Sequence, residues 1–342
     1  MTGIVYDNRY LLHEPIGFHP ESPQRLTAIY SMLEKEGFTE TLKKISPRYA
    51  TEEEISLKHT PSYIKEVENI TKNGSAYLDA DTYTCEKSYE IAKLAVGGVL
   101  ESIDAIISEE ITNAFAFIRP PGHHAESSKA MGFCIFNNVA VGAKYVQKKY
   151  NLKKILIIDW DLHHGNGTQE AFYNDPTVLY FSTHQYPYYP GTGAFYETGI
   201  NEGIGYTINI PLNFSCGDTE YIYIFENILK PIAFQFSPDF IIVSAGFDSY
   251  VEDPLGGMEV TSKGFGALAE SVLKIAEQTC QNRVLFVLEG GYNLDGLAQS
   301  AFWTLKAMTG EKLIPEDTKI IPPKMEQIMK NAKEHFGKFW KL

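Results

Sequence analysis

The chain has 342 residues, and 44% of them are hydrophobic, which is enough to build a sizeable buried core. Its formal net charge of −13 disfavours nucleic-acid binding, because a strongly acidic surface repels phosphate backbones. The charge is compatible with basic partners, although solubility alone also accounts for it. A membrane-spanning helix needs about 18 or more consecutive apolar residues, and no stretch of the chain has them. The N-terminus lacks the pattern of a secretory signal. We therefore expect a cytoplasmic protein that does not enter a membrane.

The cysteines also favour a reducing compartment. They lie far apart in the sequence and form no Cys-x-x-Cys pair, so the pattern predicts free thiols and no disulfide framework. They are Cys85, Cys134, Cys216 and Cys280.

A single domain is expected over residues 1–342, because no internal repeat and no long Pro/Gly/Ser-rich linker divides the chain. The core of this domain is expected over about residues 12–310. Beyond the core, the apolar residues from Met325 onward fall on one stripe at helical spacing. This stripe predicts a C-terminal helix at about residues 324–340 that packs on the core.

Three further helices are predicted in chain order. Ser22 and Pro23 indicate the start of the first, as an N-cap followed by proline at the first helical position, and Gly37 is its expected stop. A long helix is expected at about residues 87–109, and another over about Thr261–Cys280.

Apolar runs rich in β-formers recur between these helices. Their hydrophobicity is nearly continuous, as it is in strands buried on both faces. The clearest runs are Ala114–Ile118, Ile155–Asp159, Val178–Ser182, Phe240–Ser244 and Val284–Leu288. Alternation of strands and helices predicts a mostly parallel sheet covered by helices on both faces. Ligands bind beyond the carboxyl ends of the strands in such sheets, so functional residues are expected just after these runs.

The first of these strand ends carries two adjacent histidines. The segment Arg119–Ala125 follows its strand directly, with prolines that restrict the backbone and a glycine that permits a tight turn. His123 and His124 therefore lie where ligands are expected, and histidine is the usual general base near neutral pH. A histidine pair by itself is more often structural, so its interpretation depends on the other strand ends.

Two further strand ends supply acidic side chains. Side chains two residues apart on an extended chain point the same way, so Asp159, Asp161 and His163 can all be directed at one point. A third acid, Asp248, follows the strand at Phe240–Ser244. Asp161, His163 and Asp248 would give a metal ion three protein ligands and leave one position open, which is the pattern of a catalytic metal site.

The last strand is followed by Glu289-Gly290-Gly291-Tyr292. The two glycines let a tyrosine loop approach the site closely, and a phenol there can donate a hydrogen bond to a developing oxyanion. Gly-Gly-Tyr alone would be an ordinary turn. A base, a three-ligand metal site and a phenol at four separate strand ends together predict a hydrolytic centre.

At this point the sequence resembles the zinc-dependent histone deacetylase family. The motifs that carry the resemblance are Arg119–Ala125, Gly132–Asn138, Asp159–Gln169, Ser244–Asp248, Asp253–Gly257 and Leu288–Leu294, together with His19–Leu26 near the start. Their order and spacing look like the class II branch and its bacterial relatives, the histone deacetylase-like amidohydrolases and acetylpolyamine amidohydrolases. The resemblance extends from about Leu12 to about Gly310 and implies the single-domain arginase/deacetylase α/β fold.

The resemblance implies a role for each central residue. Asp161, His163 and Asp248 would bind one zinc ion per chain, with iron(II) as the alternative ion. His124 would act as the general base and then as the acid that protonates the leaving amine, while His123 would assist electrostatically.

The resemblance also places residues around the substrate. Tyr292 would bind the carbonyl oxygen and the tetrahedral oxyanion. Gly132 and Phe133 would form one wall of the tunnel for the acylated lysine, and Tyr189 would face them. The other substrate-binding residues would be Leu255 at the rim, Gly290 and Gly291. Asp81 would be a rim acid that holds the substrate backbone, and a solvated loop carboxylate is the alternative interpretation.

Supporting residues follow from the same resemblance. Asp159 would orient His123, and Asn166 would orient His124. The family also binds structural potassium. An inner potassium site would involve Asp159, Asp161, His163, Ser182 and Thr183, and an outer one Phe172, Asp175, Val178 and Tyr206. An ordinary strand end and core packing are the alternative interpretations of the two sets.

The implied reaction is the removal of acetyl or other acyl groups from lysine side chains of proteins or peptides by a metal-activated water. Polyamine-specific relatives carry Glu in the Asp-Pro-x-Gly segment where this chain has Leu255, so lysine is favoured over acetylated polyamines. A non-catalytic acyl-lysine binder is a third hypothesis, which the presence of Tyr292 and His124 disfavours. Gly165 cannot supply the extra acid of an arginase-like binuclear site. Oligomerisation is left open.

Overall fold

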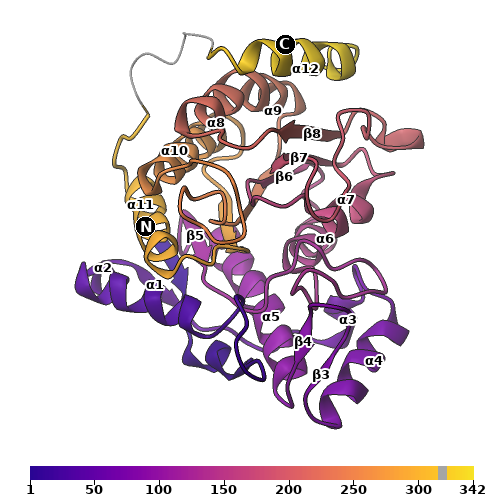
Figure 1. Ribbon diagram of the computed structural model, residues 1–342, viewed down its shortest axis with the longest axis vertical. Helices are drawn as coiled ribbons and strands as arrows, with labels where there is room; N and C mark the ends of the chain where they lie inside the picture. Colours follow the sequence, from indigo (N-terminus) through magenta and orange to yellow (C-terminus); the bar gives the residue numbers. More distant parts are fainter. Residues whose placement is uncertain (315–321) are drawn as a thin grey trace.

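Eight parallel strands form the central sheet of the computed structural model, which describes residues 1–314 and 322–342 (Figure 1). Their order across the sheet is β2-β1-β5-β10-β9-β6-β7-β8, and each neighbouring pair is parallel. The strands are β1 (Thr2–Val5), β2 (Lys43–Ile45), β5 (Asn113–Ala116), β6 (Ile155–Asp159), β7 (Val178–Gln185), β8 (Thr207–Leu212), β9 (Phe240–Ala245) and β10 (Val284–Leu288). A separate antiparallel hairpin pairs β3 (Ala76–Tyr77) with β4 (Tyr83–Thr84).

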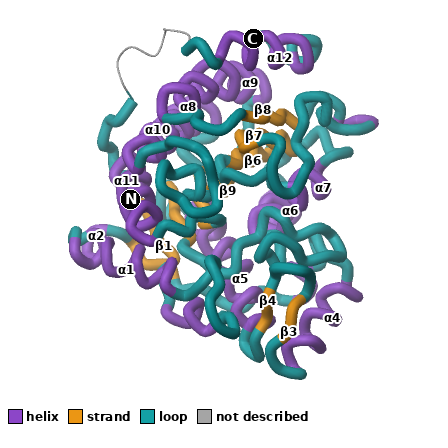
Figure 2. Tube along the Cα trace, viewed as in Figure 1, coloured by secondary structure: helices purple, strands orange, loops and turns teal. Residues whose placement is uncertain are grey.

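Helices cover both faces of the sheet, which confirms the predicted fold class (Figure 2). On one face, α5 and α6 contact the strands, and on the other α1, α10 and α11 pack together. The helices are α1 (Gln24–Lys35), α2 (Phe38–Thr41), α3 (Glu52–Ile55), α4 (Pro61–Lys72), α5 (Ser88–Ile107), α6 (Asn138–Tyr150), α7 (Asn166–Phe172), α8 (Asp218–Ile224), α9 (Lys230–Phe236), α10 (Ser262–Thr279), α11 (Leu294–Met308) and α12 (Met325–Phe336). Parallel strands need such crossover connections.

The strands predicted from apolar runs are all present, and β6 and β10 have the predicted bounds. The prediction missed β1, β2 and β8. Two of the residues of β2 are exposed. β8 is mostly buried, but it lies at the edge of the sheet, and polar residues and Pro211 interrupt its apolar residues, so neither strand forms a continuous apolar run. β1 is a short strand at the N-terminus.

The predicted helices are present with small shifts at their ends. Pro23 is the N-cap residue of α1, so the helix begins one residue later than the prediction that placed proline inside it. Gly37 follows α1 with a φ of +72°, the left-handed conformation expected at a helix stop. The Thr261 side chain caps α10 by accepting a hydrogen bond from the Gly264 amide at 3.1 Å. The C-terminal helix ends at Phe336, earlier than predicted.

The C-terminal helix α12 packs near the β8 edge of the sheet (Figure 1). Phe336 and Met325 are buried on its inner side. Beyond the helix, the Trp340 indole donates a hydrogen bond to the Gly205 carbonyl at 2.7 Å. The apolar stripe of the tail therefore serves core packing, as the sequence pattern predicts.

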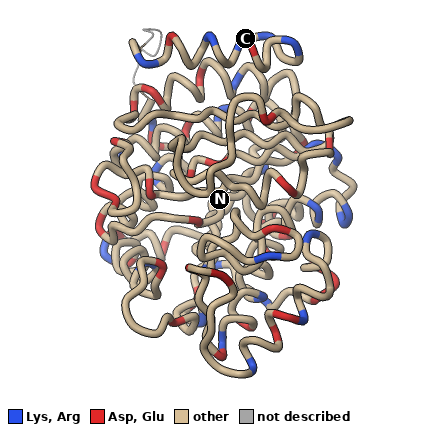
Figure 3. Tube along the Cα trace, turned by 45° about the vertical axis from the view of Figure 1, so that its right-hand side comes forward, with Lys and Arg blue, Asp and Glu red and all other residues tan. Residues whose placement is uncertain are grey.

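Charged side chains lie on many elements of the chain. Acidic and basic residues are interspersed over the view in Figure 3. Within residues 1–314 and 322–342, no helix combines the length and the hydropathy that crossing a membrane requires.

A buried histidine makes the fold sensitive to acid. Nε2 of His59 accepts the amide hydrogen of Asn137 at 2.8 Å, and burial lowers the pKa of His59 from 6.5 to about 3. The unfolded chain therefore binds one more proton at His59 than the native state does between these two pH values. The contribution of neutral His59 to the free energy of unfolding is fully present above pH 6.5 and falls as the pH drops towards 3. We expect His59→Gln to reduce the slope of unfolding free energy against pH in this window by up to about 1.4 kcal/mol per pH unit. Urea unfolding across the window measures it, and an unchanged slope contradicts the assignment.

Candidate active site

A narrow pocket of about 90 Å³ opens beyond the carboxyl ends of the strands. This is the edge at which ligands bind in open α/β sheets. The pocket is lined by Asp81, Pro121, His123, His124, Gly132, Phe133, His163, Tyr189, Leu255, Gly290 and Tyr292. Residues that lie far apart in the sequence therefore meet around one small cavity.

Strand register brings the supporting residues to one row. Asp159, the last residue of β6, lies opposite Ser182 of β7 and Ser244 of β9. All three side chains are buried. The loops that follow these strands consequently start at the same level along the sheet. The residues that follow Asp159 and Ser244 can therefore meet at one point beyond the strand ends.

That common point is formed by Asp161, His163 and Asp248. One ligand atom from each lies within 4.8 Å of the others. His163 Nδ1 is 3.0 Å from an Asp248 oxygen and 3.3 Å from an Asp161 oxygen. Backbone amides hold both carboxylates, with Leu162 N donating to Asp248 at 2.8 Å and Gly290 N to Asp161 at 2.8 Å.

The charges of this cluster fit a cation. Burial and the neighbouring Asp161 carboxylate raise the pKa of Asp248 to about 7. Two carboxylates in a buried site repel each other, and a metal ion between them would remove that repulsion. The donor set of two oxygens and one nitrogen is suited to a divalent ion that keeps an open position.

A second group of metal-binding side chains lies close by. His123, Cys134 and Glu289 also bring one ligand atom each within 4.8 Å. Their polar atoms already have partners, because Glu289 accepts from the Gly122 amide at 2.6 Å and from the Ser244 hydroxyl at 3.2 Å. Neither Cys134 nor Glu289 lines the pocket, whereas His163 does. The cluster of Asp161, His163 and Asp248 is therefore the candidate metal centre.

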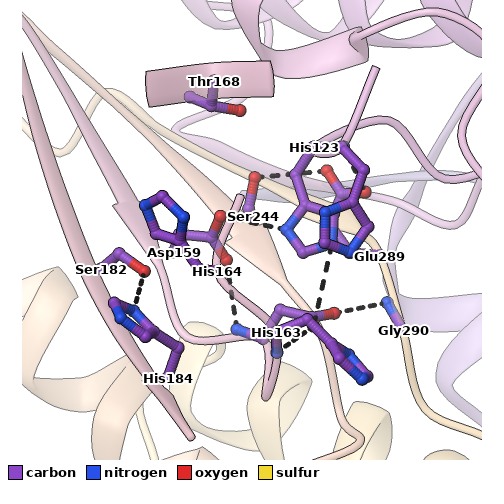
Figure 4. A network of polar contacts seen from close by, with 12 residues as sticks. His123, Asp159, His163, His164, Thr168, Ser182, His184, Ser244, Glu289 and Gly290 are labelled. Carbon is purple, nitrogen blue, oxygen red and sulfur yellow. Dashed lines mark hydrogen bonds and ion pairs between the residues drawn. The ribbon is translucent and has the colours of Figure 1, made fainter. Parts of the chain in front are cut away.

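The two adjacent histidines differ in their environments. Figure 4 shows the polar network around His123, which includes Asp159 and His163. His123 Nδ1 is 3.1 Å from the Asp159 carboxylate. Burial opposes its protonation, but Asp161 and Asp159 outweigh burial and raise the pKa of His123 to about 10. Burial and the neighbouring His123 and His163 instead hold the pKa of His124 well below its usual range. Near neutral pH, His123 is therefore cationic and His124 is neutral, ready to accept a proton.

Asn166 lies beside the neutral histidine. Its Oδ1 is 2.8 Å from Nδ1 of His124. Because an amide oxygen only accepts hydrogen bonds, Nδ1 of His124 carries the proton and Nε2 has the free lone pair. The predicted pairs of His123 with Asp159 and His124 with Asn166 are thus both in contact.

Tyr292 is held at the pocket by its neighbours. Its amide donates to the Asp253 carboxylate at 2.6 Å, and its ring contacts Phe133 edge-on with centroids 5.8 Å apart. The Arg25 guanidinium lies 5.0 Å from the centre of the Tyr292 ring. Burial raises the pKa of Tyr292 well above 10, so the phenol keeps its proton and can donate it in a hydrogen bond.

Two aromatic side chains form the walls of the pocket. Phe133 lies on one side, and Tyr189 packs edge-on against His124 with ring centroids 5.1 Å apart. Gly132 has a φ of +56°, and a Cβ atom there would lie 2.3 Å from Cδ2 of His124. Glycine is therefore required for the wall to approach His124.

The remaining predicted rim residues have distinct positions. Asp81 and Leu255 line the pocket, and the Asp81 carboxylate also accepts the Gly132 amide at 3.2 Å. Gly290 lines it as well. Gly291 does not, and its carbonyl instead accepts a hydrogen bond from Arg25 at 2.7 Å.

The residues predicted for potassium form two groups, and each group includes residues of β7. At the inner place, the Ser182 hydroxyl is 2.8 Å from His184 Nδ1, and the Thr183 hydroxyl has no hydrogen-bond partner among the described residues. At the outer place, Phe172 and Val178 are buried and Tyr206 is half-buried. There the Asp175 carboxylate pairs with the Lys144 ammonium at 2.6 Å.

A buried ionic network was not predicted. Glu21 pairs with Arg119, and Arg25 Nη1 is 3.2 Å from the same carboxylate. Arg25 in turn donates to the backbone carbonyls of Gly291 and Glu289 at 2.7 and 2.5 Å. The network ties the N-terminal segment to the loop that carries Tyr292. The charged residues within the His19–Leu26 motif were the only sequence feature that pointed to this network. Their partners are distant in sequence, so the pairing could not be predicted.

Two more supporting carboxylates were missed. Glu289 holds the backbone of the histidine loop through Gly122, and Asp253 holds the tyrosine loop. Asp253 also accepts the amide of Leu255 at 2.9 Å, so it links the pocket rim to Tyr292. Both acids belong to motifs that carry the family resemblance, but side chains that bind backbone amides leave no periodic pattern in the sequence.

Comparison with known proteins gives matches over nearly the whole chain. A family model described as the histone deacetylase domain matches residues 19–308. A probable deacetylase of Archaeoglobus fulgidus is 38% identical over 100% of this chain and 99% of its own length. Histone deacetylase 15 of Arabidopsis thaliana is 41% identical over 91% of this chain and 57% of its own length. The crystal structure of the HDA15 HD domain has a TM-score of 0.91 at 38% identity, covering 99% of this chain and 95% of that one.

These matches include the loops around the pocket as well as the sheet, and they define the protein as a hydrolase of the arginase/deacetylase fold. The chain belongs to the histone deacetylase family. It is a deacetylase, as the sequence motifs predicted.

Proposed function

We propose that this deacetylase is zinc-dependent and hydrolyses the amide of acetylated or otherwise acylated lysine side chains in proteins or peptides. The observation that carries the proposal is the meeting of Asp161, His163 and Asp248 at a pocket that His124 and Tyr292 also line or border. Zinc suits one imidazole and two carboxylates with an open position. Bound there, the ion would polarise the acyl carbonyl and lower the pKa of the attacking water.

The protein's own side chains divide the remaining work. His124, neutral with a free Nε2, would take a proton from the attacking water and later deliver it to the leaving amine. His123, whose cationic form the Asp159 carboxylate favours, would stabilise negative charge nearby. The Tyr292 phenol would donate a hydrogen bond to the acyl oxygen as charge develops on it.

The shape and chemistry of the pocket support lysine as the amine. A volume of about 90 Å³ between Phe133 and Tyr189 suits an extended aliphatic chain. Leu255 at the lining presents an apolar side chain, which offers no partner to the distant ammonium of a polyamine. Asp81 beside the opening can accept hydrogen bonds from a peptide backbone.

An inner structural potassium ion is part of the proposal. Asp159 and Ser182 are buried next to each other across the strand register. Nε2 of His184 donates to the Gly193 carbonyl at 2.8 Å, so its Nδ1 accepts the Ser182 hydroxyl hydrogen. The lone pairs of Ser182 thereby stay available to a cation. The outer potassium site and the cytoplasmic location stay predictions.

The test is a side-by-side assay of an acetyl-lysine peptide and an N-acetylated polyamine, with purified protein, metal analysis and a hydroxamate inhibitor as control. We expect hydroxamate-sensitive turnover of the peptide that exceeds turnover of the polyamine by at least about tenfold, a difference of about 1.4 kcal/mol in transition-state binding. Leu255→Glu should shift this preference towards the polyamine, and Leu255→Gln is the uncharged control.

Each outcome separates the hypotheses. Polyamine preference in the unmodified protein would overturn lysine as the substrate and keep the metal centre. Iron in place of zinc in the most active preparations would overturn the choice of ion. Absence of turnover on either substrate, with tight hydroxamate binding, would favour the acyl-lysine binder.

A further inference from the structure

A glutamate outside the pocket lining contacts the partner of the catalytic base. Asn166 Nδ2 is 2.9 Å from an Oε1 oxygen of Glu126 and 3.4 Å from the His124 carbonyl. Asn166 is buried and is the first residue of α7, and Glu126 is half-buried in the loop that follows the histidine pair. A line of contacts therefore runs from His124 through the amide of Asn166 to the Glu126 carboxylate.

These contacts decide which way the amide of Asn166 faces. A carboxylate and a carbonyl both only accept hydrogen bonds, so the NH₂ end of Asn166 must face Glu126 and the His124 carbonyl. The amide oxygen is then left for His124, whose Nδ1 lies 2.8 Å away. If the amide were reversed, its NH₂ group would face Nδ1 of His124 and stabilise the tautomer whose proton is on Nε2. That tautomer cannot act as a base at Nε2.

We propose that Glu126 is a positioning residue that fixes the orientation of the Asn166 amide and so keeps Nε2 of His124 free as the general base. The inference rests on the proposed role of His124. The negative charge of Glu126 also polarises the amide, which makes its oxygen a stronger acceptor for the proton on Nδ1. Asn166 and Glu126 together therefore accept and hold the proton on Nδ1 of His124, a task that a single carboxylate beside the histidine could also perform.

The sharpest test combines substitutions at both positions. Glu126→Ala should lower kcat by about 10- to 100-fold with little change in KM and unchanged zinc content, the range typical of residues that orient a site through a neighbour. Glu126→Gln, whose amide oxygen can still accept from Asn166, should cost only a few-fold. Asn166→Asp alone should be strongly impaired, because it places a second carboxylate against Glu126 at 2.9 Å. Adding Glu126→Gln to that variant should restore activity, because the glutamine amide then donates to the new carboxylate.

A merely structural role of Glu126 would not make the effect of Glu126→Gln on activity change sign between two backgrounds. Glu126→Gln should reduce activity slightly in the natural background and raise it in the Asn166→Asp background. Equal losses in both backgrounds would overturn the inference, as would an unchanged kcat in Glu126→Ala. If Glu126→Ala does not fold, the two glutamine variants carry the test.

A control and a second readout separate this inference from the proposed function. Glu170→Gln is the matched control, because Glu170 accepts a hydrogen bond from the Ser127 hydroxyl of the same loop at 2.7 Å, and its side chain makes no hydrogen bond to the Asn166 side chain. Nitrogen-15 NMR of the histidine rings reports the tautomer of His124 without any turnover. A proton on Nδ1 in the natural protein that moves to Nε2 in Glu126→Ala supports the inference whatever the substrate is. A proton on Nε2 in the natural protein contradicts it.

Discussion

Replacing Tyr292 by phenylalanine is expected to lower the turnover of an acetyl-lysine peptide by about 10²- to 10³-fold, the cost of removing one oxyanion donor. The substitution removes only the hydroxyl. The ring would still pack edge-on against Phe133 and below the Arg25 guanidinium, and the backbone would stay bound to Asp253. The fold and the metal centre should therefore be unaffected, and the loss should fall on kcat.

Steady-state kinetics together with zinc content measure this effect. Tyr188→Phe is the matched control, because the Tyr188 hydroxyl donates to the Leu255 carbonyl at 3.2 Å and Tyr188 does not line the pocket. We expect nearly full activity in that control. Unaltered turnover in Tyr292→Phe would show that the phenol is not the oxyanion donor.

Asp248→Asn is expected to separate metal binding from folding. It removes one of the two carboxylates that would hold the ion. Mutating a residue that only supports a metal ligand lowers metal affinity by about 10- to 100-fold, so the loss of zinc affinity here should be larger. The asparagine can still accept the Leu162 amide hydrogen through its Oδ1. Loss of the repulsion with Asp161, which raises the pKa of Asp248, should leave the metal-free variant at least as stable as the metal-free natural protein.

Thermal unfolding with and without zinc tests this separation. At a zinc concentration about 100 times its dissociation constant, the natural protein should gain about 2.7 kcal/mol, and the variant should gain much less. Asp239→Asn is the matched control, because Asp239 precedes β9 as Asp248 follows it and binds the Lys153 and Lys154 amides at the opposite end of the strand. A variant that binds zinc as tightly as the natural protein would remove Asp248 from the metal centre.

Much of the site was predictable because its residues follow buried strands. A strand covered on both faces needs a continuous apolar run, so β6, β9 and β10 were visible in the sequence, and the polar residues at their ends were visible with them. The same reasoning could not detect β2 or β8, because exposed or edge strands carry no such run. Motif order then supplied the family, which the comparison confirmed.

By itself, the sequence determined the fold class and the identity of the residues that meet at the pocket, because local hydrophobicity and short motifs encode both. Only the tertiary structure decided what holds them there. Arg25 bonds to carbonyls more than two hundred and sixty residues away, with a separation of 266 to Gly291, and Glu126 reaches Asn166 across a separation of 40. Such contacts depend on the packing of the whole sheet, and a hydrogen bond between distant residues leaves no periodic trace in either segment. The chemical groups could therefore be identified from the sequence, while their orientation and protonation were fixed by folding.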